Sequence, residues 1–493
     1  MRKEKIFENN TEIKDIWIPR ERGGKPPKSS EILLVDEKKL FKNQLLEAVK
    51  ATKNQIFLCS FLLADEDLIT AIEEAANRGV RVYLMMSSEV QLGKEEREDM
   101  DYNPEHVKYH KEMLRRLESK MLIRDGDHLH AKMLITDPFD GGKGFLSTAN
   151  FTTEALERNQ EIGVVLPSVQ EAFSVFRYAF WCEAKRESDG KGRFKPIKNR
   201  DLNIPVSDNL FVDFSNRREL IDEILSILND TNGKIFLSTF GLDLDTKIFA
   251  AIKKRAQKDP VKIFIRPRNK NLPAIQTLAQ LENIEILGFR WIHAKFILAP
   301  ENKRGVIMTA NFDQRLEGVD PTFEIGVKLS ATQVDDLQKI VEFWMKNAEC
   351  IYRPRIKYKD ISENYVLILK DNRLEELQIR TIEEVERPQQ NVDLRNYIAW
   401  KNSEVKLSNE KKHSRKIKII ENYSPMRLPE KAIRVEKEEK LTKNLKKIAG
   451  TLFTDGKTTH PLFIHKGKLY YALKKEKLPD IEINNEISLV LEK

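Results

Sequence analysis

Short apolar runs and stretches of helical periodicity alternate along the first 350 residues of the chain. Short apolar runs are typical of buried strands, whereas apolar residues that recur every three or four positions indicate amphipathic helices. Strands are predicted at residues 55–61, 80–86, 234–240 and 261–265, and helices at residues 39–51, 67–77, 169–183, 218–228, 246–257 and 333–347. Strands that alternate with helices of this length predict an α/β fold with a largely parallel sheet.

Several short motifs occur twice in this region. His130-Ala-Lys132 returns as His293-Ala-Lys295, at an offset of 163 residues. Other pairs that keep the register are Glu161 with Glu324, Phe180-Trp181 with Phe343-Trp344 and, at an offset of 161, Thr148 with Thr309 and Asn150 with Asn311. The region is therefore a tandem repeat of one α/β half, whose Phe-Trp pairs are expected to pack in the core.

The repeat sets the expected domain boundaries. We place the first half at residues 30–190, the second half at residues 205–350, and an exposed, charged linker at residues 191–204. Residues 1–29 are expected to form an extended N-terminal arm. Residues 351–493 lie beyond the repeat, and their strand-like runs predict a small β-rich accessory domain.

The positive charge of the chain is concentrated in this last region. Residues 351–493 contain 31 Lys and Arg against 22 Asp and Glu, a formal charge of +9, whereas residues 1–350 carry −1. Such asymmetry favours a polyanionic partner, either nucleic acid or anionic lipid. A well-solvated lysine-rich surface explains the charge equally well.

The cysteines and the distribution of apolar residues indicate the cellular compartment of the protein. The three cysteines, Cys59, Cys182 and Cys350, show no C-x-x-C spacing, which favours reduced thiols and disfavours a structural zinc site. The N-terminus lacks an apolar signal core, and no run approaches the ~18–20 apolar residues that span a bilayer. We therefore expect a cytoplasmic protein without a membrane span.

The repeated motifs combine groups that suit a tetrahedral anion. On a strand, residues i and i+2 point to the same face, so each His is expected to project with its Lys, and each Thr with its Asn. If the copies pack about a pseudo-twofold axis, both sets meet at one point. The lysines and asparagines would then bind the non-bridging oxygens of a phosphate and stabilise its transition state, with the two hydroxyls in the same constellation.

Two imidazoles supply the remaining chemistry of a phosphodiesterase. One neutral ring can attack phosphorus while the other, protonated, donates to the leaving oxygen, and the roles reverse when water hydrolyses the phosphohistidine. Glu161 and Glu324 each follow the histidine of their own copy by 31 residues, and we expect each to accept the other ring N–H of that histidine. A metal site is disfavoured because Lys132 and Lys295 would repel the cation.

At these residues the chain resembles the phospholipase D superfamily, which is marked by a duplicated H-x-K-x4-D motif followed by G-S-x-N. His130 to Asp137 matches the first motif in full, whereas Pro300 stands at the aspartate position of the second. The resemblance implies two pseudo-twofold-related halves with one active site, His130 as nucleophile and His293 as general acid and base. It also implies no metal or other cofactor, and a supporting role for Asp137 that leaves the two half-sites unequal.

The resemblance does not indicate which phosphodiester is the substrate. The basic tail, with its cluster at residues 411–418 and Tyr470-Tyr471 among lysines, favours a nuclease that acts on DNA rather than RNA. The alternatives are a phospholipase D or phosphatidyl-transfer enzyme, and a degenerate module that binds nucleic acid without catalysis. By analogy with the superfamily, such a nuclease would serve defence or repair as a monomer or homodimer, beside a helicase or another defence-system protein.

Overall fold

The computed structural model describes residues 3–7, 11–35, 39–88, 104–127, 129–191, 193–214, 217–318 and 322–381, and seven short strands between residues 405 and 491. The chain divides into two compact units. One unit comprises Ile13–Ile356 with Val366–Glu375, and the other comprises Met1–Glu12, Lys357–Tyr365 and Glu376–Lys493. The first of these units contains both copies of the repeat.

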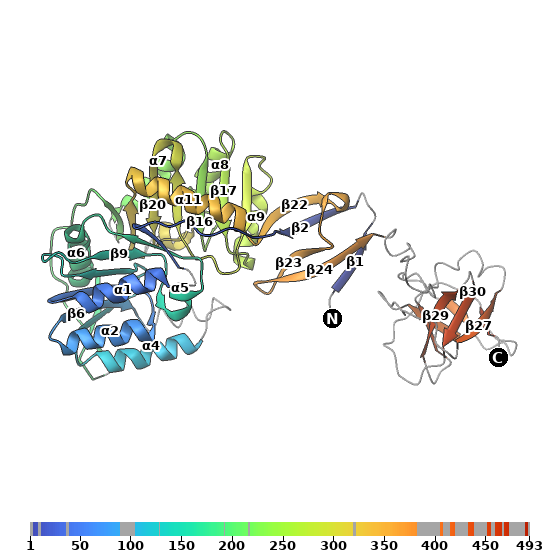
Figure 1. The fold of residues 1–493 in the computed structure, drawn as a ribbon, viewed down its shortest axis with the longest axis horizontal. Helices are drawn as coiled ribbons and strands as arrows, with labels where there is room; N and C mark the ends of the chain where they lie inside the picture. Colours follow the sequence, from blue (N-terminus) through green and yellow to red (C-terminus); the bar gives the residue numbers. More distant parts are fainter. Residues whose placement is uncertain are drawn as a thin grey trace. The chain divides into compact units, whose positions relative to one another are not determined.

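Each copy forms a sheet of the same strand order. In the first copy the order is β7-β6-β4-β8-β9-β11-β3, and in the second it is β18-β17-β16-β19-β20-β21-β14. The first set is β3 (Ile32–Leu34), β4 (Gln55–Ser60), β6 (Arg81–Ser87), β7 (Leu122–Gly126), β8 (Met133–Thr136), β9 (Gly144–Ser147) and β11 (Ile162–Val165). The second set is β14 (Leu210–Phe214), β16 (Ile235–Thr239), β17 (Val261–Ile265), β18 (Ile284–Gly288), β19 (Phe296–Ala299), β20 (Arg304–Met308) and β21 (Glu324–Lys328). The predicted duplication of one α/β half is confirmed (Figure 1).

The expectation of a largely parallel sheet is wrong. Strands β4, β6 and β7 run parallel, but β8, β9, β11 and β3 follow one another in antiparallel pairing. Parallel neighbours need a long crossover, which the helices after β4 and β6 supply. The motif-bearing strands β8 and β9 are joined by a short loop, and a short loop permits only antiparallel pairing.

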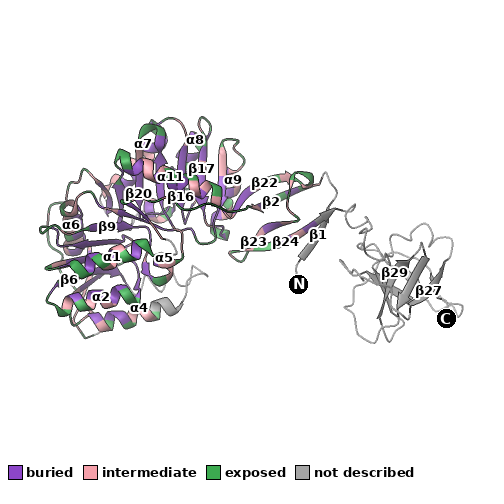
Figure 2. Cartoon of the chain, in the orientation of Figure 1, coloured by how far each residue is buried: buried purple, intermediate pink, exposed green. Residues whose placement is uncertain are grey.

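Helices cover both faces of the first sheet. On its outer face, α1 (Leu40–Ala51), α2 (Glu66–Asn77) and α4 (Pro104–Leu117) bury their apolar residues in one core with β4, β6 and β7. On its inner face, α6 (Val169–Tyr178) shares a second core with the other half, including α11 (Ala331–Asn347). The strands are almost wholly buried as a result (Figure 2). The second half adds α7 (Glu219–Asp230), α8 (Lys247–Ala256) and α9 (Leu272–Leu278).

The two Phe-Trp pairs bury different members. Phe180 is 1% exposed, whereas Trp181 is only partly buried and lies between the guanidinium groups of Arg124 and Arg200, 4.0 and 4.3 Å from its ring centre. In the second copy Trp344 is the buried member, 4% exposed. A π-helical turn at Ala179–Glu183 ends α6, whereas α11 continues as a regular helix. The wider turn rotates the pair, so that the phenylalanine faces the core.

The segments on either side of the repeat add strands to the two sheets. Instead of an extended arm, the N-terminal segment contains β2 (Glu12–Pro19), which lies between β22 (Cys350–Lys357) and β23 (Tyr365–Lys370). Trp17 of β2 is fully buried and packs edge-on against Tyr352, with ring centres 5.1 Å apart. In the expected linker, β13 (Phe194–Pro196) pairs with β12 (Arg186–Ser188) and extends the first sheet.

The other unit is rich in strands. Strand β1 (Lys3–Phe7) pairs in parallel with the end of β24 (Arg373–Thr381). A seven-stranded sheet is formed by β25 (Val405–Leu407), β26 (Arg415–Ile419), β27 (Ala432–Lys437), β28 (Thr451–Thr454), β29 (Thr459–His465), β30 (Lys468–Ala472) and β31 (Leu489–Leu491). Residues 411–414 and the side chains of Tyr470 and Tyr471 lie outside the described structure, so the accessory domain's role remains a prediction.

No helix in the described ranges is long and apolar enough to cross a membrane. All three cysteines are free thiols, and Cys59 and Cys350 are buried while Cys182 is half-buried. These positions agree with the expectation of packed thiols.

The glycine two residues after each repeated glutamate is required by helix packing. A Cβ atom on Gly163 would overlap the ring of Phe41 in α1, and one on Gly326 would lie 2.6 Å from Cδ1 of Leu220 in α7. We expect Gly163→Ala to lower the free energy of unfolding by about 1–3 kcal/mol, the usual cost of overpacking a core. Urea denaturation measures this, with Gly126→Ala as control, because a Cβ there meets only ordinary contacts. Equal stability of the two variants would contradict this account.

Candidate active site

The topology brings the three repeated motifs of each copy to one edge of its sheet. His130 and Lys132 precede β8, Thr148 and Asn150 follow β9, and Glu161 precedes β11. Because these strands are antiparallel neighbours, the start of β8, the end of β9 and the start of β11 lie side by side. The second copy repeats this arrangement at the ends of β19, β20 and β21.

Two symmetric backbone contacts join these edges across the halves. Leu129 forms a bridge with Phe323, and Ile292 forms the equivalent bridge with Gln160. The N–H of His130 donates to the carbonyl of Phe323 at 3.1 Å, and the N–H of His293 donates to that of Gln160 at 3.0 Å. Each catalytic-motif histidine is therefore fixed beside the residue that precedes the other half's glutamate.

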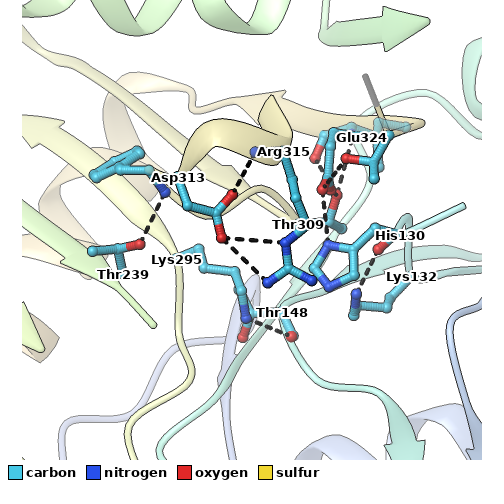
Figure 3. Close-up of polar contacts among 12 residues, drawn as sticks. His130, Lys132, Thr148, Thr239, Lys295, Thr309, Asp313, Arg315 and Glu324 are labelled. Carbon is cyan, nitrogen blue, oxygen red and sulfur yellow. Dashed lines mark hydrogen bonds and ion pairs between the residues drawn. The ribbon is translucent and has the colours of Figure 1, made fainter. Parts of the chain in front are cut away.

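The histidine–glutamate pairs cross between the halves. Nδ1 of His130 lies 2.8 Å from Oε1 of Glu324, and Nδ1 of His293 lies 2.7 Å from Oε1 of Glu161. The predicted pairing within each copy is thus wrong, although the predicted residue types and their role as ring partners hold. The backbone bridges explain the crossing, because they set each ring next to the opposite glutamate. Figure 3 shows Glu324 and Thr309 at the ring of His130.

The repeated threonines orient the glutamates. Oγ1 of Thr148 donates to Oε2 of Glu161 at 2.6 Å, and Oγ1 of Thr309 donates to Oε2 of Glu324 at 2.5 Å. A second hydroxyl, that of Thr322, donates to Oε1 of Glu324 at 2.9 Å. Within the predicted constellation, the threonine hydroxyls therefore have a positioning role.

The two lysines are wholly buried at the site. Nζ of Lys132 donates to the carbonyl of His130, and Nζ of Lys295 donates to the carbonyl of His293 at 2.6 Å. Nζ of Lys295 also lies 3.4 Å from the carbonyl oxygen of Thr148, in the other half. Burial lowers the pKa of Lys295 to about 7, against the opposing charges of Glu161 and Glu324. Lys132, together with Lys295 in its protonated form, therefore places positive charge beside the two histidines.

The asparagines carry buried polar atoms that have no partner. Among the described residues, Oδ1 of Asn150 and Oδ1 of Asn311 are both buried without a hydrogen bond. Asn311 lines a small pocket together with His130 and Glu324. A buried amide oxygen without a hydrogen-bond partner costs free energy. Because the same atom lacks a partner in both copies, we infer that it accepts a hydrogen bond only when a ligand or water is bound.

The electrostatic field holds both imidazoles neutral and both glutamates ionised. Burial lowers the pKa of His293 to about 4 and also lowers that of His130, against the charges of Glu161 and Glu324. Burial alone would raise the pKa of Glu324, but His130, Lys132 and Thr309 bring it down to about 2. A ring that donates Nδ1–H to its carboxylate keeps a lone pair on Nε2. At His293, Nζ of Lys295 also lies 2.9 Å from Nδ1.

Asp137 of the first motif lies away from the site. Five residues of strand separate it from Lys132, roughly 16 Å. Its carboxylate accepts the backbone N–H groups of Lys53, Asn54 and Gln55 at 2.7, 2.9 and 2.8 Å. Its role is to fasten the loop that leads into β4.

The second copy performs the same task with a different residue. There, Oδ1 of Asn302 accepts the N–H of Asn232 at 3.1 Å, and Asn232, like Lys53, is the second residue after the preceding helix. The proline at position 300 therefore alters a distant loop. The loop that contains the aspartate position thus contacts the segment before β4 or β16, and the effect of that position on the equality of the two half-sites stays a prediction.

An additional cation, Arg315, enters the site beside His130 (Figure 3). Its Nη2 lies 3.2 Å from Oδ2 of Asp313, and both residues line the same pocket as His130. Sequence reasoning missed them because the corresponding first-copy residues are Thr152 and Glu154. The available signal was this departure from the repeat directly after the second T-x-N motif.

Phenylalanines form the apolar walls behind the two rings. Phe61 packs edge-on against His130 with ring centres 5.6 Å apart, and Phe240 packs in the same way against His293 at 4.8 Å. No group of three or more His, Cys, Asp or Glu residues with the geometry of a metal site occurs in the part of the chain that is described.

Residues 45–181 match the family model described as cardiolipin synthase, PLD-like domain. This match to a PLD-like domain supports the resemblance of the chain to the phospholipase D superfamily. A comparison with curated proteins gives no match.

Several solved structures are similar to this chain. Phosphatidylserine synthase from Haemophilus influenzae is 11% identical, with a TM-score of 0.48 over 71% of this chain and 91% of that one. Polyphosphate kinase from Porphyromonas gingivalis is 16% identical, with a TM-score of 0.42 over 63% of this chain, which spans about half of the kinase (49%). Nuc, a phospholipase D family member from Salmonella typhimurium, is 17% identical, with a TM-score of 0.25 over 31% of this chain and 95% of Nuc. These likenesses leave the substrate open.

The structural role of Asp137 predicts a loss of stability on its removal. We expect Asp137→Ala to lower the free energy of unfolding by about 1–3 kcal/mol, because three part-buried backbone N–H groups lose their acceptor. Asp140→Ala is the matched control in the same loop, since Asp140 makes one exposed hydrogen bond, to Asn54. Urea denaturation at neutral pH separates the two variants, and equal losses would argue against the role of Asp137.

The lowered pKa of His293 predicts an acid-sensitive fold. Below about pH 6.5 the unfolded chain takes up a proton on this ring, whereas the folded chain resists protonation until about pH 4. Stability should therefore be full above pH 6.5 and fall by up to about 3 kcal/mol as the pH drops to 4. In His293→Asn, which keeps an N–H for Glu161, this part of the slope should disappear from urea titrations. An unchanged slope would contradict the assignment.

Proposed function

We propose that this chain is a metal-independent nuclease of the phospholipase D superfamily, which cleaves DNA through a phosphohistidine. The observation that supports the proposal is the crossed arrangement of two neutral imidazoles, each held at Nδ1 by a buried glutamate of the other half. A ring held at Nδ1 presents Nε2 for attack or for proton transfer. Two such rings, with two buried lysines between them, match the needs of a two-step displacement at phosphorus.

In the first step, Nε2 of His130 attacks phosphorus and forms a P–N bond. The bond from phosphorus to the leaving oxygen breaks, and that oxygen takes a proton from Nε2 of His293. The negative charge of the bound phosphodiester supplies the field that protonates His293, because an adjacent anion favours the imidazolium. Glu324 stabilises the positive charge that develops on the attacking ring.

In the second step, water replaces the leaving group. Nε2 of His293, now neutral, removes a proton from the water, whose oxygen attacks phosphorus as the P–N bond breaks. His130 leaves as a neutral ring with its Nδ1–H still directed at Glu324. One phosphomonoester and one alcohol result, and both histidines return to their starting states.

The surrounding cations would stabilise the phosphate in both transition states. Lys132, Arg315 and the protonated form of Lys295 supply positive charge, and the amide N–H groups of Asn150 and Asn311 supply donors for the non-bridging oxygens. Because the two lysines and Asn311 are buried and already oriented, they need little reorganisation as charge develops.

The choice of DNA rests on charge. The excess of +9 over residues 351–493 suits a polyanion that extends beyond the active site. We further propose that the enzyme acts as a monomer or homodimer in defence or repair, with a helicase or another defence-system protein as partner.

Labelled single-stranded DNA, duplex DNA, RNA and phospholipid vesicles, each incubated with the protein in EDTA, test the substrate class. We expect cleavage of DNA that is insensitive to the chelator. Turnover of lipid alone would assign a phospholipase or phosphatidyl-transfer activity instead. Salt-sensitive DNA binding without turnover would identify a degenerate binding module.

Substitution of the two histidines tests the mechanism. His130→Asn and His293→Asn keep an N–H toward the glutamate but remove Nε2, so each should lower the rate of DNA cleavage at least ~10²-fold. Thermal melting at neutral pH checks that the fold is retained. Radiolabelled substrate quenched in alkali should trap phosphate on His130 in the wild-type protein, and label on His293 would reverse the two roles.

A further inference from the structure

A cationic pocket lies next to the proposed catalytic centre. Its volume is about 280 Å³, and it is lined by Arg266, Pro267, Arg290, Trp291, Asn372, Arg373 and Leu374. Three of these residues carry guanidinium groups and none carries a carboxylate. The volume lies just below the ~300–1,000 Å³ of typical small-molecule sites, which suits one nucleotide unit.

The pocket is connected to His293 through two aromatic residues. Trp291 precedes His293 by two residues, and its carbonyl accepts the N–H of Gln160, which holds this loop against the first half. Phe240, whose ring packs against His293, also contacts Arg266, with the guanidinium carbon 5.6 Å from its ring centre. A ligand in the pocket would therefore lie close to Phe240, the aromatic residue behind His293 in the proposed catalytic centre.

Trp291 is an exposed aromatic held in place by cations. Its side chain is 38% exposed, an unusual state for so large an apolar surface. The guanidinium carbons of Arg158 and Arg266 lie 4.2 and 5.1 Å from its ring centre. Arg266 lines the pocket with the indole, whereas Arg158 does not. This combination of aromatic and guanidinium planes is the type of surface on which an unstacked base binds.

Two of the pocket's arginines, Arg290 and Arg373, are at most partly neutralised by carboxylates of the described residues. Glu349 lies 3.5 Å from Arg290 but also 3.8 Å from Arg22, so one carboxylate serves two guanidinium groups. Arg373, exposed at the hairpin between β23 and β24, forms no ion pair with any residue that the structure describes. The guanidinium charge at the pocket is not fully offset by carboxylates, and it lies beside an exposed indole. This combination suits a ligand that has both a phosphate and a planar ring.

We propose that this pocket binds the nucleotide next to the cleaved phosphodiester, with its base on Trp291 and its phosphate at Arg290 and Arg373. The inference rests on the proposed nuclease function and deepens it, because stacking on Trp291 requires a base that is free of a duplex. The preferred substrate is therefore single-stranded DNA.

Binding measurements with the full chain test the pocket. Fluorescence anisotropy of a labelled single-stranded oligodeoxynucleotide is measured in EDTA, in the His130→Asn background, which binds without cleavage. Trp291→Ala should weaken binding about 5- to 150-fold, the range for loss of one stacked base, and Trp291→Phe should restore most of it. Phe139→Ala is the matched control, because Phe139 is a 70% exposed aromatic outside the pocket.

The phosphate contacts have a separate signature. Arg373→Ala should reduce the slope of log affinity against log salt concentration by about 0.7, the value for one phosphate contact on a single strand. Lys253→Ala, which removes an exposed charge on α8 away from the pocket, should leave the slope nearly unchanged. In the active protein, Trp291→Ala should raise KM for single-stranded DNA with little change in kcat.

The outcomes separate the two proposals. Cleavage of single-stranded DNA with Kd, KM and salt slope unaltered by Trp291→Ala and Arg373→Ala would overturn the pocket assignment alone. Absence of any nucleic-acid binding or turnover by the wild-type protein would overturn the nuclease itself. Loss of binding to phosphatidylglycerol vesicles in these two variants, with DNA binding intact, would assign the pocket to a lipid headgroup.

Discussion

The crossed pairing of histidine and glutamate is the constraint on which the site depends. Neither half contains a complete set of groups, because the ring of His130 is oriented by Glu324 and that of His293 by Glu161. The bridges of Leu129 with Phe323 and of Ile292 with Gln160 fix this exchange through the backbone. The interface between the halves is therefore part of the proposed active site, and the large shared core holds that interface in place.

Burial of four ionisable groups makes this interface expensive to form. Lys132, Lys295 and Glu161 are 0% exposed and Glu324 is 3% exposed. Removing isolated charges from water costs several kcal/mol each, and only close pairing and hydrogen bonding offset that cost. The threonine hydroxyls and the ring N–H groups donate hydrogen bonds to the carboxylates, whereas the lysines donate mainly to backbone carbonyl oxygens. The site is thus preorganised for an anion that would complete the charge balance.

The repeat carried most of the information that the sequence could supply. Offsets of 163 and 161 predicted the duplicated sheets, and the spacing of residues i and i+2 predicted which side chains share an edge. The crossing of the pairs was not predictable, because the sequence spacing allows each glutamate to pair with the histidine of either half. Only the backbone bridges between the halves decide the pairing. The antiparallel strands were missed because apolar runs report burial and carry no direction. Arg315 and the Trp291 pocket depend on loop positions that no periodicity describes.

Chemical differences between the two histidines arise from residues that the repeat does not preserve. Opposite Glu324 in the sheet lies Asp213, whereas the equivalent position opposite Glu161 is Val35. Burial, with the charge of Glu324, raises the pKa of Asp213 to about 7. A protonated Asp213 leaves Glu324 as the only carboxylate charge of that pair, and a deprotonated one adds a second negative charge beside Glu324. Duplication therefore supplies the geometry of two equivalent imidazoles, and divergence at neighbouring positions supplies unequal fields around them, as the proposed nucleophile and proton donor require.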